Sequence, residues 1–350
     1  MNLYKKIFMS KYIVVTGGAG YIGSHTIIEI FQNTTYEVIS IDNFSNSYED
    51  VYERIHQITN KKVISLNIDL CNKNTLFQQL NHFAKDIQGI IHFAAYKSVP
   101  ESIAEPFKYY QNNIQSLLNI SEFAIQHSIS NFIFSSSCSV YGDIKTSPVT
   151  ENTPLPIPNS PYAHTKQIGE QILIQLVQQC QFPLKILALR YFNPVGSHTS
   201  ALIGELPKYN LTGLVPNIIR AVLHKIPILE VYGNDYATKD GTPIRDYIHV
   251  SDIAQAHVLA LEYIEKISTP SYYDVINLGT GKGYTVLEVI QTFENINQVK
   301  VPYKIAPRRS GDVEAIYANN DKALQLLKWK PKYSLETMIQ SAWQWGKQRY

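Results

Sequence analysis

The stretch Thr16-Gly17-Gly18-Ala19-Gly20-Tyr21-Ile22-Gly23 decides the fold of this 350-residue chain. It stands between an apolar run, Tyr12–Val15, and a helical pattern, Ser24–Gln32. Its spaced glycines, Gly17, Gly20 and Gly23, allow a tight strand-to-helix turn and a close approach of the backbone to a pyrophosphate. The free N–H groups at the start of the helix, together with the helix dipole, favour a phosphate at this place. The stretch therefore predicts a nucleotide-binding turn between a strand and a helix.

The chain around this turn alternates strands and helices. Short apolar runs predict strands at Tyr12–Val15, Glu37–Ile41, Val63–Asn67, Gly89–Phe93, Asn131–Ser135 and Lys185–Arg190. Helical periodicity appears between them, at Ser24–Gln32, Thr75–Phe83 and Tyr109–His127. Apolar strands joined by helices indicate an α/β fold with a Rossmann-type, doubly wound parallel sheet that is covered on both faces.

The pattern changes near residue 190. Loops that contain glycine and proline occupy 193–216 and 232–245, and the strand and helix signals become weaker. We therefore expect a dinucleotide-binding domain over 1–190, with an N-terminal arm at 1–11. A smaller, irregular α/β domain over 191–350 is expected to bind the substrate, with some of its segments returning to the parallel sheet.

An acidic residue ends the second strand. Asp42 lies about twenty residues beyond the glycine turn, where a carboxylate accepts hydrogen bonds from the adenosine ribose. A carboxylate repels a 2′-phosphate, so Asp42, with Asn43, favours NAD over NADP as the cofactor. Outside this context an Asp-Asn pair is most often only a turn.

The segment SPYAHTK at 160–166 places a phenol and an ammonium four residues apart. Pro161 suits the first turn of a helix, and in a helix Tyr162 and Lys166 share one face. An ammonium favours the phenolate and lowers the pKa of the tyrosine, and a positively charged nicotinamide would act in the same direction. The pair predicts a base that takes a hydroxyl proton near neutral pH.

A run of serines follows the strand that begins at Asn131. Ser137 lies at the carboxyl end of this strand, where parallel sheets bind ligands, and its hydroxyl can hydrogen-bond a reacting oxygen. The simpler interpretation is that these serines only terminate the strand.

The composition excludes several classes of protein. A formal net charge of +2 without long runs of like charge excludes a general nucleic-acid or membrane-surface binder. No run of about eighteen apolar residues exists, so no membrane span is expected. The cysteines Cys71, Cys138 and Cys180 are too scattered for a disulfide framework, and the ten histidines lack metal-ligand spacing. We expect a cytoplasmic protein without a metal.

Longer motifs resemble one family along almost the whole chain. They are TGGAGYIGSHT at 16–26, IDN at 41–43, IHFAAYKSVPES at 91–102, FSSSCSVYGD at 134–143, SPYAHTK at 160–166, LRYFNPVGSH at 189–198, YGNDYATKDGTPIRDYIHV at 232–250 and PRRSGD at 307–312. They are similar to the extended short-chain dehydrogenase/reductases and, within these, to the UDP-hexose 4-epimerases. The last three motifs lie outside the cofactor-binding core and discriminate between members of the family.

The resemblance implies a set of residues that bind NAD. Tyr162 is the catalytic base, and Lys166 anchors the nicotinamide ribose. The other positions that it assigns to the cofactor are Gly17, Gly20, Tyr21, Ile22, Gly23, Asp42, Asn43, Asp69, Leu70, Phe93, Ala94, Ala95, Lys97 and Asn112.

It also implies a UDP-sugar site in the second domain. Ser137 contacts a sugar hydroxyl, and Asn193 holds the diphosphate sugar. A uridine-diphosphate clamp matches Tyr232, Arg245, Arg309 and Asp312, which suits an aromatic ring against a base and guanidinium groups against phosphates. Lys97, Tyr162, Leu214 and Ile316 complete the positions assigned to the substrate.

The activity that the resemblance implies is the interconversion of UDP-galactose and UDP-glucose. The proton of the C4 hydroxyl passes to Tyr162, and hydride from C4 is held on tightly bound NAD. The 4-keto sugar then turns over in the pocket and receives the hydride on its other face. The resemblance further implies a homodimer and a place in galactose metabolism and nucleotide-sugar supply.

Three positions depart from the commonest pattern of the family. Ala95 replaces a glycine beside the cofactor, and Gly213 replaces an asparagine or histidine that contacts the diphosphate. Ile316 stands where some members carry a tyrosine at the wall of the sugar pocket. Members with a smaller residue there accept N-acetylated hexosamines, so UDP-N-acetylglucosamine 4-epimerisation, as the sole or a second activity, stays open.

Other functions of the same fold are alternatives. A nucleotide-sugar 4,6-dehydratase needs an acidic pair after the strand-end hydroxyl, where this chain has Cys138-Ser139. UDP-glucuronate decarboxylation and UDP-arabinose/xylose epimerisation are minor alternatives. A non-catalytic NAD-sensing protein would be expected to lose the Tyr162–Lys166 pair or the clamp, and this chain has both.

Overall fold

A parallel sheet of seven strands forms the centre of the protein, in the order β11-β6-β5-β4-β1-β2-β3. The computed structural model describes residues 11–144, 146–209, 211–309 and 311–350. The strands are β1 (Tyr12–Thr16), β2 (Glu37–Asp42), β3 (Ile64–Asn67), β4 (Ile87–His92), β5 (Asn131–Ser137), β6 (Lys185–Tyr191) and β11 (Tyr272–Leu278). Every neighbouring pair in this sheet is parallel. The predicted doubly wound α/β fold is therefore confirmed.

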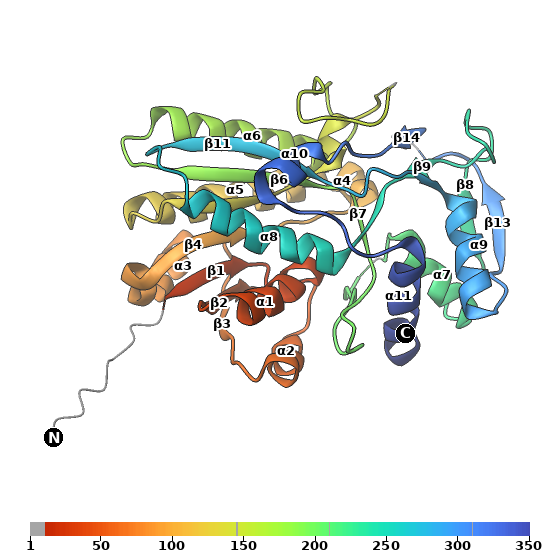
Figure 1. Ribbon diagram of the computed structural model, residues 1–350, viewed down its shortest axis with the longest axis horizontal. Helices are drawn as coiled ribbons and strands as arrows, with labels where there is room; N and C mark the ends of the chain where they lie inside the picture. Colours follow the sequence, from red (N-terminus) through yellow and green to blue (C-terminus); the bar gives the residue numbers. More distant parts are fainter. Residues whose placement is uncertain (1–10, 145, 210, 310) are drawn as a thin grey trace.

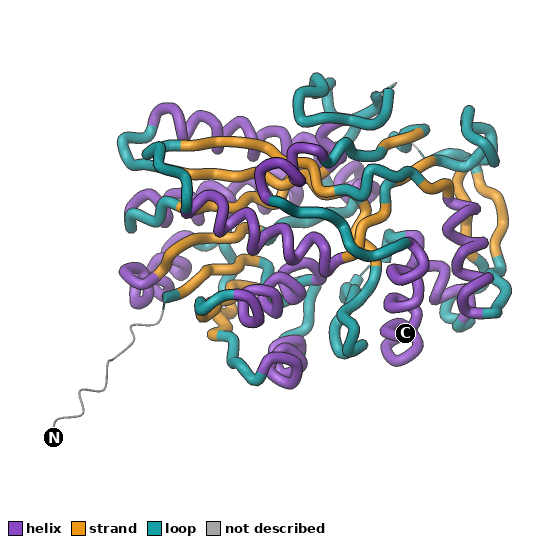
Figure 2. Tube along the Cα trace, in the orientation of Figure 1, coloured by secondary structure: helices purple, strands orange, loops and turns teal. Residues whose placement is uncertain are grey.

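Helices cover both faces of the sheet (Figures 1 and 2). One face carries α1 (Tyr21–Asn33), α2 (Val51–Thr59) and α8 (Val250–Glu265). The other face carries α3 (Lys73–Leu80), α5 (Pro106–Gln126) and α6 (Pro161–Gln179). Shorter turns of helix are η1 (Asn81–Asp86), α4 (Val99–Ala104) and η2 (Cys138–Tyr141).

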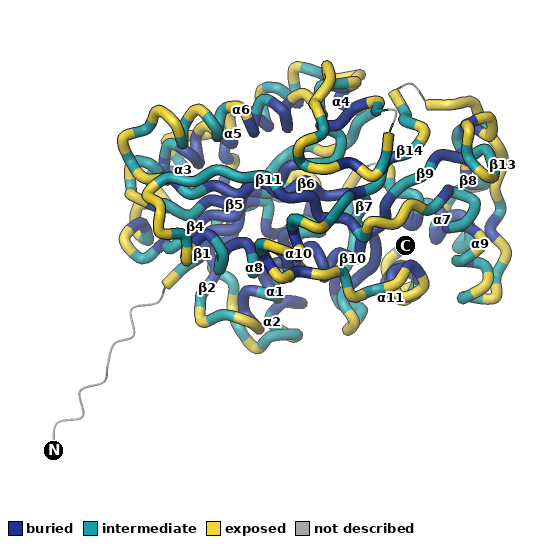
Figure 3. Tube along the Cα trace, turned by 45° about the horizontal axis from the view of Figure 1, so that its top comes forward, coloured by how far each residue is buried: buried dark blue, intermediate teal, exposed yellow. Residues whose placement is uncertain are grey.

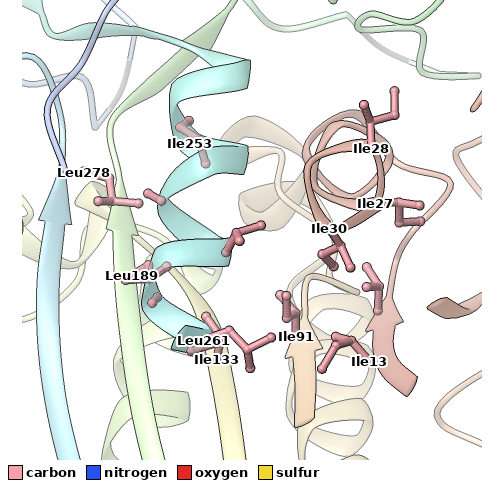
Figure 4. Packing of buried hydrophobic residues seen from close by; sticks show 14 of the residues in the cluster. Ile13, Ile27, Ile28, Ile30, Ile91, Ile133, Leu189, Ile253, Leu261 and Leu278 are labelled. Carbon is pink, nitrogen blue, oxygen red and sulfur yellow. The ribbon is translucent and has the colours of Figure 1, made fainter. Parts of the chain in front are cut away.

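The strands are apolar because both of their faces are buried. In β1, Ile13 and Val15 point into the core on the α1 side, whereas Val14 points into the core on the α5 side. Figure 4 shows Ile27 and Ile30 of α1 packed toward Ile13 and Ile91 of the sheet. Burying one such side chain stabilises the fold by about 1.5–3 kcal/mol. The continuous burial of the sheet is visible as dark strands in Figure 3.

The second half of the chain builds a smaller, irregular unit at one end of the sheet, at the right of Figure 1. Its sheets have only two or three strands each, in the orders β10-β7, β12-β9-β14 and β13-β8. Their bounds are β7 (Asn193–Val195), β8 (Leu229–Tyr232), β9 (Ile244–Arg245), β10 (Tyr247–His249), β12 (Tyr284–Thr285), β13 (Tyr303–Ala306) and β14 (Ala315–Ile316). The helices are α7 (Leu214–Val222), α9 (Val286–Asn297), α10 (Asp321–Leu327) and α11 (Leu335–Arg349).

Two elements of this half, α8 and β11, pack on the main sheet, β11 as its edge strand next to β6. Most of the N-terminal arm predicted for 1–11 lies outside the described residues. Among the helices described, none is long and apolar enough to cross a membrane.

Candidate active site

A cavity of about 460 Å³ runs along the carboxyl ends of β1, β2, β4, β5 and β6. All residues that the sequence analysis assigned to the cofactor line it: Gly17, Gly20, Tyr21, Ile22, Gly23, Asp42, Asn43, Asp69, Leu70, Phe93, Ala94, Ala95, Lys97, Asn112, Tyr162 and Lys166. The cavity therefore extends from the glycine turn to the tyrosine–lysine pair.

The glycine turn is closed by tight backbone contacts. Gly17 has a φ of +68°, and a Cβ there would lie 2.8 Å from the nitrogen of Ala94 on the next strand-end loop. A Cβ on Gly23 would lie 2.4 Å from the carbonyl oxygen of Gly17. The Tyr21 hydroxyl donates a hydrogen bond of 2.5 Å to the Gly196 carbonyl, which ties this turn to the second half of the chain.

Asp42 ends β2 and faces the cavity. Its carboxylate accepts hydrogen bonds from the Ala19 N–H, the Phe44 N–H and the Ser47 hydroxyl. Burial raises the pKa of Asp42, and these three donors lower it. An ionised carboxylate can accept about four hydrogen bonds, so a lone pair is left for a ribose hydroxyl.

Helix α6 begins where the sequence predicted. The Ser160 side chain caps it by accepting a hydrogen bond from the Ala163 N–H, and Pro161 occupies the first helical position. Tyr162 and Lys166 thus lie one turn apart and line the same cavity.

The ammonium of Lys166 is directed toward β5. It donates hydrogen bonds to the carbonyl oxygen of Ser135 at 2.6 Å and to its hydroxyl at 3.3 Å, and it lies over the ring of Phe134. Burial lowers the pKa of Lys166 to about 7, and the Glu170 carboxylate one turn later raises it.

The pKa of Tyr162 differs from the sequence prediction. We expected the neighbouring ammonium to lower this pKa, but burial raises the pKa of Tyr162 to about 12, against the lowering effect of a hydrogen bond with Ser137. The prediction was wrong in direction because it counted the charge of Lys166 and left out the desolvation of the phenol.

Ser137 lowers the pKa of Tyr162 but lies outside the residues that line the cavity. It is the last residue of β5, and its hydroxyl also accepts a hydrogen bond from the Ser139 N–H.

Four residues predicted to clamp a uridine diphosphate come together in the smaller unit. The guanidinium of Arg309 lies 3.8 Å from the ring centroid of Tyr232 at the end of β8. Arg245 of β9 forms an ion pair with Asp312. The N–H of Asp312 donates to the carbonyl oxygen of Arg309, which joins the two pairs.

Three further positions assigned to the substrate, Ile316, Asn193 and Leu214, lie on elements of the second half of the chain. Ile316 of β14 is opposite Arg245 in the parallel register and is only 4% exposed, because it packs in an apolar cluster with Val140, Tyr141 and Phe192. Asn193 starts β7, where its N–H donates to the Asp246 carbonyl, and Leu214 starts α7. Neither the clamp nor these residues line the 460 Å³ cavity.

Sequence reasoning missed several residues of the cavity wall, among them Glu205 and Tyr191. Glu205 lies in the irregular segment between β7 and α7, and its carboxylate forms an ion pair of 3.0 Å with Lys97. The same segment reaches the β2–α2 loop, where Lys208 donates to the Phe44 carbonyl. Tyr191 stands beside Tyr162 in the cavity. Glu205 carried no periodic signal, whereas Tyr191 belongs to the motif LRYFNPVGSH, which pointed to it.

The described residues contain no group of three or more His, Cys, Asp or Glu side chains arranged to hold a metal ion. The three cysteines are unpaired.

Comparisons with known proteins agree with this geometry. A family profile described as GDP-mannose 4,6 dehydratase matches residues 14–342. The UDP-glucose 4-epimerase of Bacillus subtilis is 43% identical over 334 residues, which cover 95% of this chain and 96% of that protein.

Two solved structures are similar over nearly their whole length. UDP-glucose-4-epimerase from Stenotrophomonas maltophila, with bound NAD and formylated UDP-arabinopyranose, has a TM-score of 0.91 and 40% identity, covering 97% of this chain and 98% of that one. UDP-glucose 4-epimerase from Bifidobacterium longum, in complex with NAD+ and UDP, has a TM-score of 0.90 and 41% identity with the same coverage. On this evidence the chain belongs to the UDP-glucose 4-epimerase family of the extended short-chain dehydrogenase/reductases.

Proposed function

We propose that this protein is a UDP-glucose 4-epimerase, an isomerase that interconverts UDP-galactose and UDP-glucose with NAD as its resident cofactor. The observation that carries the proposal is that Tyr162 and Lys166 line the same cavity as all of the residues assigned to NAD. This arrangement supports the proposal that a catalytic base acts next to a bound dinucleotide.

The cavity fits NAD in three respects. Gly17 leaves no room for a side chain, so the backbone can approach a pyrophosphate closely. Asp42 keeps a lone pair for the adenosine ribose, and its negative charge disfavours the 2′-phosphate of NADP. Both hydrogen bonds of the Lys166 ammonium go to Ser135, so a third N–H is left for the nicotinamide ribose. Bound NAD would supply a reversible two-electron acceptor next to C4 of the sugar.

The residues of the chain handle the proton. Tyr162, in its phenolate form, takes the proton of the C4 hydroxyl and gives it back to the same oxygen, while Ser137 hydrogen-bonds the reacting group. Because the sugar turns over before C4 receives its hydrogen back on the other face, while the proton returns to the same oxygen, only the configuration at C4 changes. Lys166 contributes a positive charge that favours the phenolate.

The UDP part is held away from the reacting carbon. Tyr232 and Arg309 suit stacking against uracil, Arg245 suits the phosphates, and Asp312 suits the uridine ribose. We assign Asn193 and Leu214 to the diphosphate side of the same site. Binding through UDP leaves the sugar free to turn over between the two half-reactions.

UDP-N-acetylglucosamine 4-epimerisation is the second candidate function. Ile316 favours it, because isoleucine is smaller than the tyrosine that other family members carry at this position. The two activities are compatible in one enzyme.

We further infer a homodimer in the cytoplasm that serves galactose metabolism and nucleotide-sugar supply. Phe107 of α5 is 78% exposed, and Leu118 on the same helix and Ile103 of α4 are also exposed. The neighbouring helix α6 has no exposed charge, because its only charged residues, Lys166 and Glu170, are buried. A second copy of the chain suits the exposed apolar side chains of this surface, and the three unpaired cysteines suit a reducing compartment.

Replacement of Tyr162 tests the function. Tyr162→Phe removes the base and leaves the shape of the cavity, so kcat for UDP-galactose should fall about 10²–10⁴-fold while NAD stays bound. Product analysis by NMR gives the rate, and the absorbance of cofactor released on denaturation gives the NAD content. Near-normal turnover by this variant would reject the proposal.

The same assays separate the alternatives. Wild-type enzyme is given UDP-galactose, UDP-N-acetylglucosamine and UDP-xylose side by side, and the products identify the sugar. A change in the near-ultraviolet absorbance of bound NAD on addition of a UDP-sugar is expected of an epimerase. A purely NAD-sensing protein would show neither a product nor this change.

A further inference from the structure

A short segment of the second half of the chain, residues 204–209, lies against the cofactor cavity. We call this segment the strap. Five of its six residues line the cavity: Gly204, Glu205, Leu206, Pro207 and Tyr209. None of them has a part in the proposed reaction, so their place in the cavity wall calls for another role.

One end of the strap is fastened to the loop that follows β2. Lys208 donates a hydrogen bond of 2.7 Å to the Phe44 carbonyl, and the N–H of Tyr209 donates to the Asn46 side chain at 3.1 Å. The Lys208 ammonium also lies over the ring of Tyr48, 5.2 Å from its centroid. This loop lines the cavity beside the expected position of the adenosine ribose.

The other end is fastened to the loop that follows β4. The Glu205 carboxylate forms an ion pair of 3.0 Å with the ammonium of Lys97. The Lys97 side chain is 53% exposed, whereas the Glu205 side chain is only 15% exposed. An ammonium has three N–H groups, so a bond to Glu205 does not prevent Lys97 from also contacting the cofactor to which it is assigned.

The C-terminal helix α11 anchors the backbone of the strap. The carbonyl oxygen of Glu205 accepts hydrogen bonds from Nε1 of Trp345 at 3.1 Å and from the Tyr350 hydroxyl at 2.8 Å. Gly204 packs so closely on the same indole ring that a Cβ there would lie 2.6 Å from it. These contacts fix the backbone from which the Glu205 carboxylate reaches Lys97.

The order of the strands places the strap across the expected position of the pyrophosphate. In the main sheet β1 lies between β4 and β2, so the glycine turn that follows β1 lies between the two loops that hold the strap. A segment tied to both of these loops spans the turn between them. A dinucleotide whose pyrophosphate rests on the glycine turn would therefore lie between that turn and the strap.

We propose that the strap retains NAD in the cavity, and that Glu205 is a positioning residue that closes the strap by holding Lys97. The reaction needs a cofactor that does not leave between its two halves, because the hydride removed from C4 must return to the same sugar. This inference rests on the proposed epimerase function and deepens it.

A double-mutant cycle tests whether Glu205 acts through Lys97. Glu205→Gln removes the charge and keeps the shape of the side chain, Lys97→Gln removes the ammonium, and the double variant carries both changes. Glu294→Gln in α9 is the matched control. Glu294 also forms an ion pair of 3.0 Å, with Lys300, and its side chain is 18% exposed, but it does not line the cavity.

The measurement is the rate at which NAD leaves the holoenzyme. The protein with its bound NAD is kept in a large excess of isotopically labelled NAD, which fills each site as it empties. Mass spectrometry then follows the unlabelled NAD that stays bound. Because no UDP-sugar is added, the release rate is independent of epimerase activity.

Glu205→Gln should raise the release rate about two- to five-fold, the effect of losing one partly exposed ion pair. Lys97→Gln should raise the rate by more, because Lys97 is also assigned to the cofactor. In the Lys97→Gln background the change at Glu205 should have no further effect. Tyr350→Phe, which removes one donor to the strap, should also speed release, and Glu294→Gln should keep the wild-type rate.

Three results would overturn the inference. The first is a wild-type protein isolated without NAD, and the second is a Glu205→Gln variant that releases NAD as slowly as the wild type. The third is an equal acceleration by Glu205→Gln with and without Lys97→Gln, together with a lower melting temperature, which indicates a merely structural role.

Two further outcomes are distinguished by the same variants. If Lys97→Gln is isolated without NAD, Tyr350→Phe takes its place, and a wild-type release rate in Tyr350→Phe would contradict the anchoring of the strap. A wild-type protein that retains NAD but has no epimerase activity would reject the proposed function, while the release rates would still decide the role of the strap.

Discussion

Tyr162 and Lys166 lie in surroundings that shift both side chains away from the charge states that the proposed reaction uses. Burial raises the pKa of Tyr162 to about 12 and lowers the pKa of Lys166 to about 7. Each unit of such a shift corresponds to about 1.4 kcal/mol. A cationic nicotinamide beside the phenol would reverse the first shift. The phenolate base is therefore expected to form only when the cofactor is bound, and Tyr162 stays protonated without it.

A prediction about the choice of sugar also concerns a single residue, Ile316. If Ile316 forms the wall of the sugar pocket as proposed, Ile316→Tyr narrows that pocket. The kcat/KM for UDP-N-acetylgalactosamine should then fall relative to that for UDP-galactose by about 10–100-fold, because one steric contact discriminates by about 1–3 kcal/mol. NMR product assays with each sugar measure the ratio.

A control comes from the same apolar cluster. Val313 is a partly buried neighbour of Ile316 in that cluster, and Val313→Ala should leave the ratio of the two activities unchanged. An unchanged ratio in Ile316→Tyr would show that Ile316 does not form the wall of the sugar pocket.

Among the elements, α6 depends on a buried ion pair behind the catalytic turn. The Glu170 carboxylate accepts hydrogen bonds from the Ser136 hydroxyl of β5 and from two nitrogens of Arg190 of β6. Arg190 also donates to the hydroxyl of Tyr141. This cluster fixes α6, and with it Tyr162 and Lys166, against the ends of two neighbouring strands.

Removing one partner of the buried Glu170–Arg190 ion pair should strongly lower the free energy of unfolding. Glu170→Gln leaves the Arg190 charge buried without its counter-ion, so the free energy of unfolding should fall by about 3–5 kcal/mol. The double variant Glu170→Met/Arg190→Met removes both charges and should lose less. Urea unfolding measures both.

The exposed ion pair of Lys73 and Glu122 serves as the control for the buried ion pair of Glu170 and Arg190. Lys73→Met should lower the free energy of unfolding by less than about 1 kcal/mol, since both partners stay in contact with water. If Glu170→Gln costs no more than Lys73→Met, α6 does not depend on the buried pair.

The elements of the first half could be predicted because short, continuous apolar runs alternate along the chain with longer amphipathic stretches. Five of the six predicted strands begin within one residue of the observed ones, and β4 begins two residues early. Helix α2 was missed since its residues mix charged and apolar side chains over only nine positions. The short strands β9, β12 and β14 have two residues each, too few for any periodicity.

The residues of the site also fall into two groups, those that the sequence predicts and those that only the folded structure brings together. Residues on the glycine turn and on α6 follow from spacing along the chain. The contact of His257 with Tyr191, and that of Glu205 with Lys97, join elements that the sequence does not relate. Whether the pKa of Tyr162 is raised or lowered depends on how deeply the phenol is buried, and only the packed fold determines this burial.

For the whole molecule, the surface over α4, α5 and α6 is expected to hold a second copy. Phe107→Asp places a charge on that surface and should convert a dimer to a 39.8 kDa monomer. Light scattering after gel filtration measures the mass.

Ile157 provides the matched control. It is 90% exposed and lies in the loop before α6, so Ile157→Asp should leave the dimer intact. A wild-type protein that is already monomeric, or a dimer that survives Phe107→Asp, would contradict this arrangement.

The position of β11 at the edge of the main sheet has a consequence for the synthesis of the chain. β11 pairs with β6 along its whole length, yet the ribosome makes it only after the entire segment from Tyr191 to Tyr272. At about 5–20 residues per second, β6 is left for seconds as an apolar strand with an open edge, and such an edge promotes aggregation. A chain stopped near residue 190 is therefore expected to aggregate more readily than the full chain, because the edge of β6 stays open until β11 pairs with it.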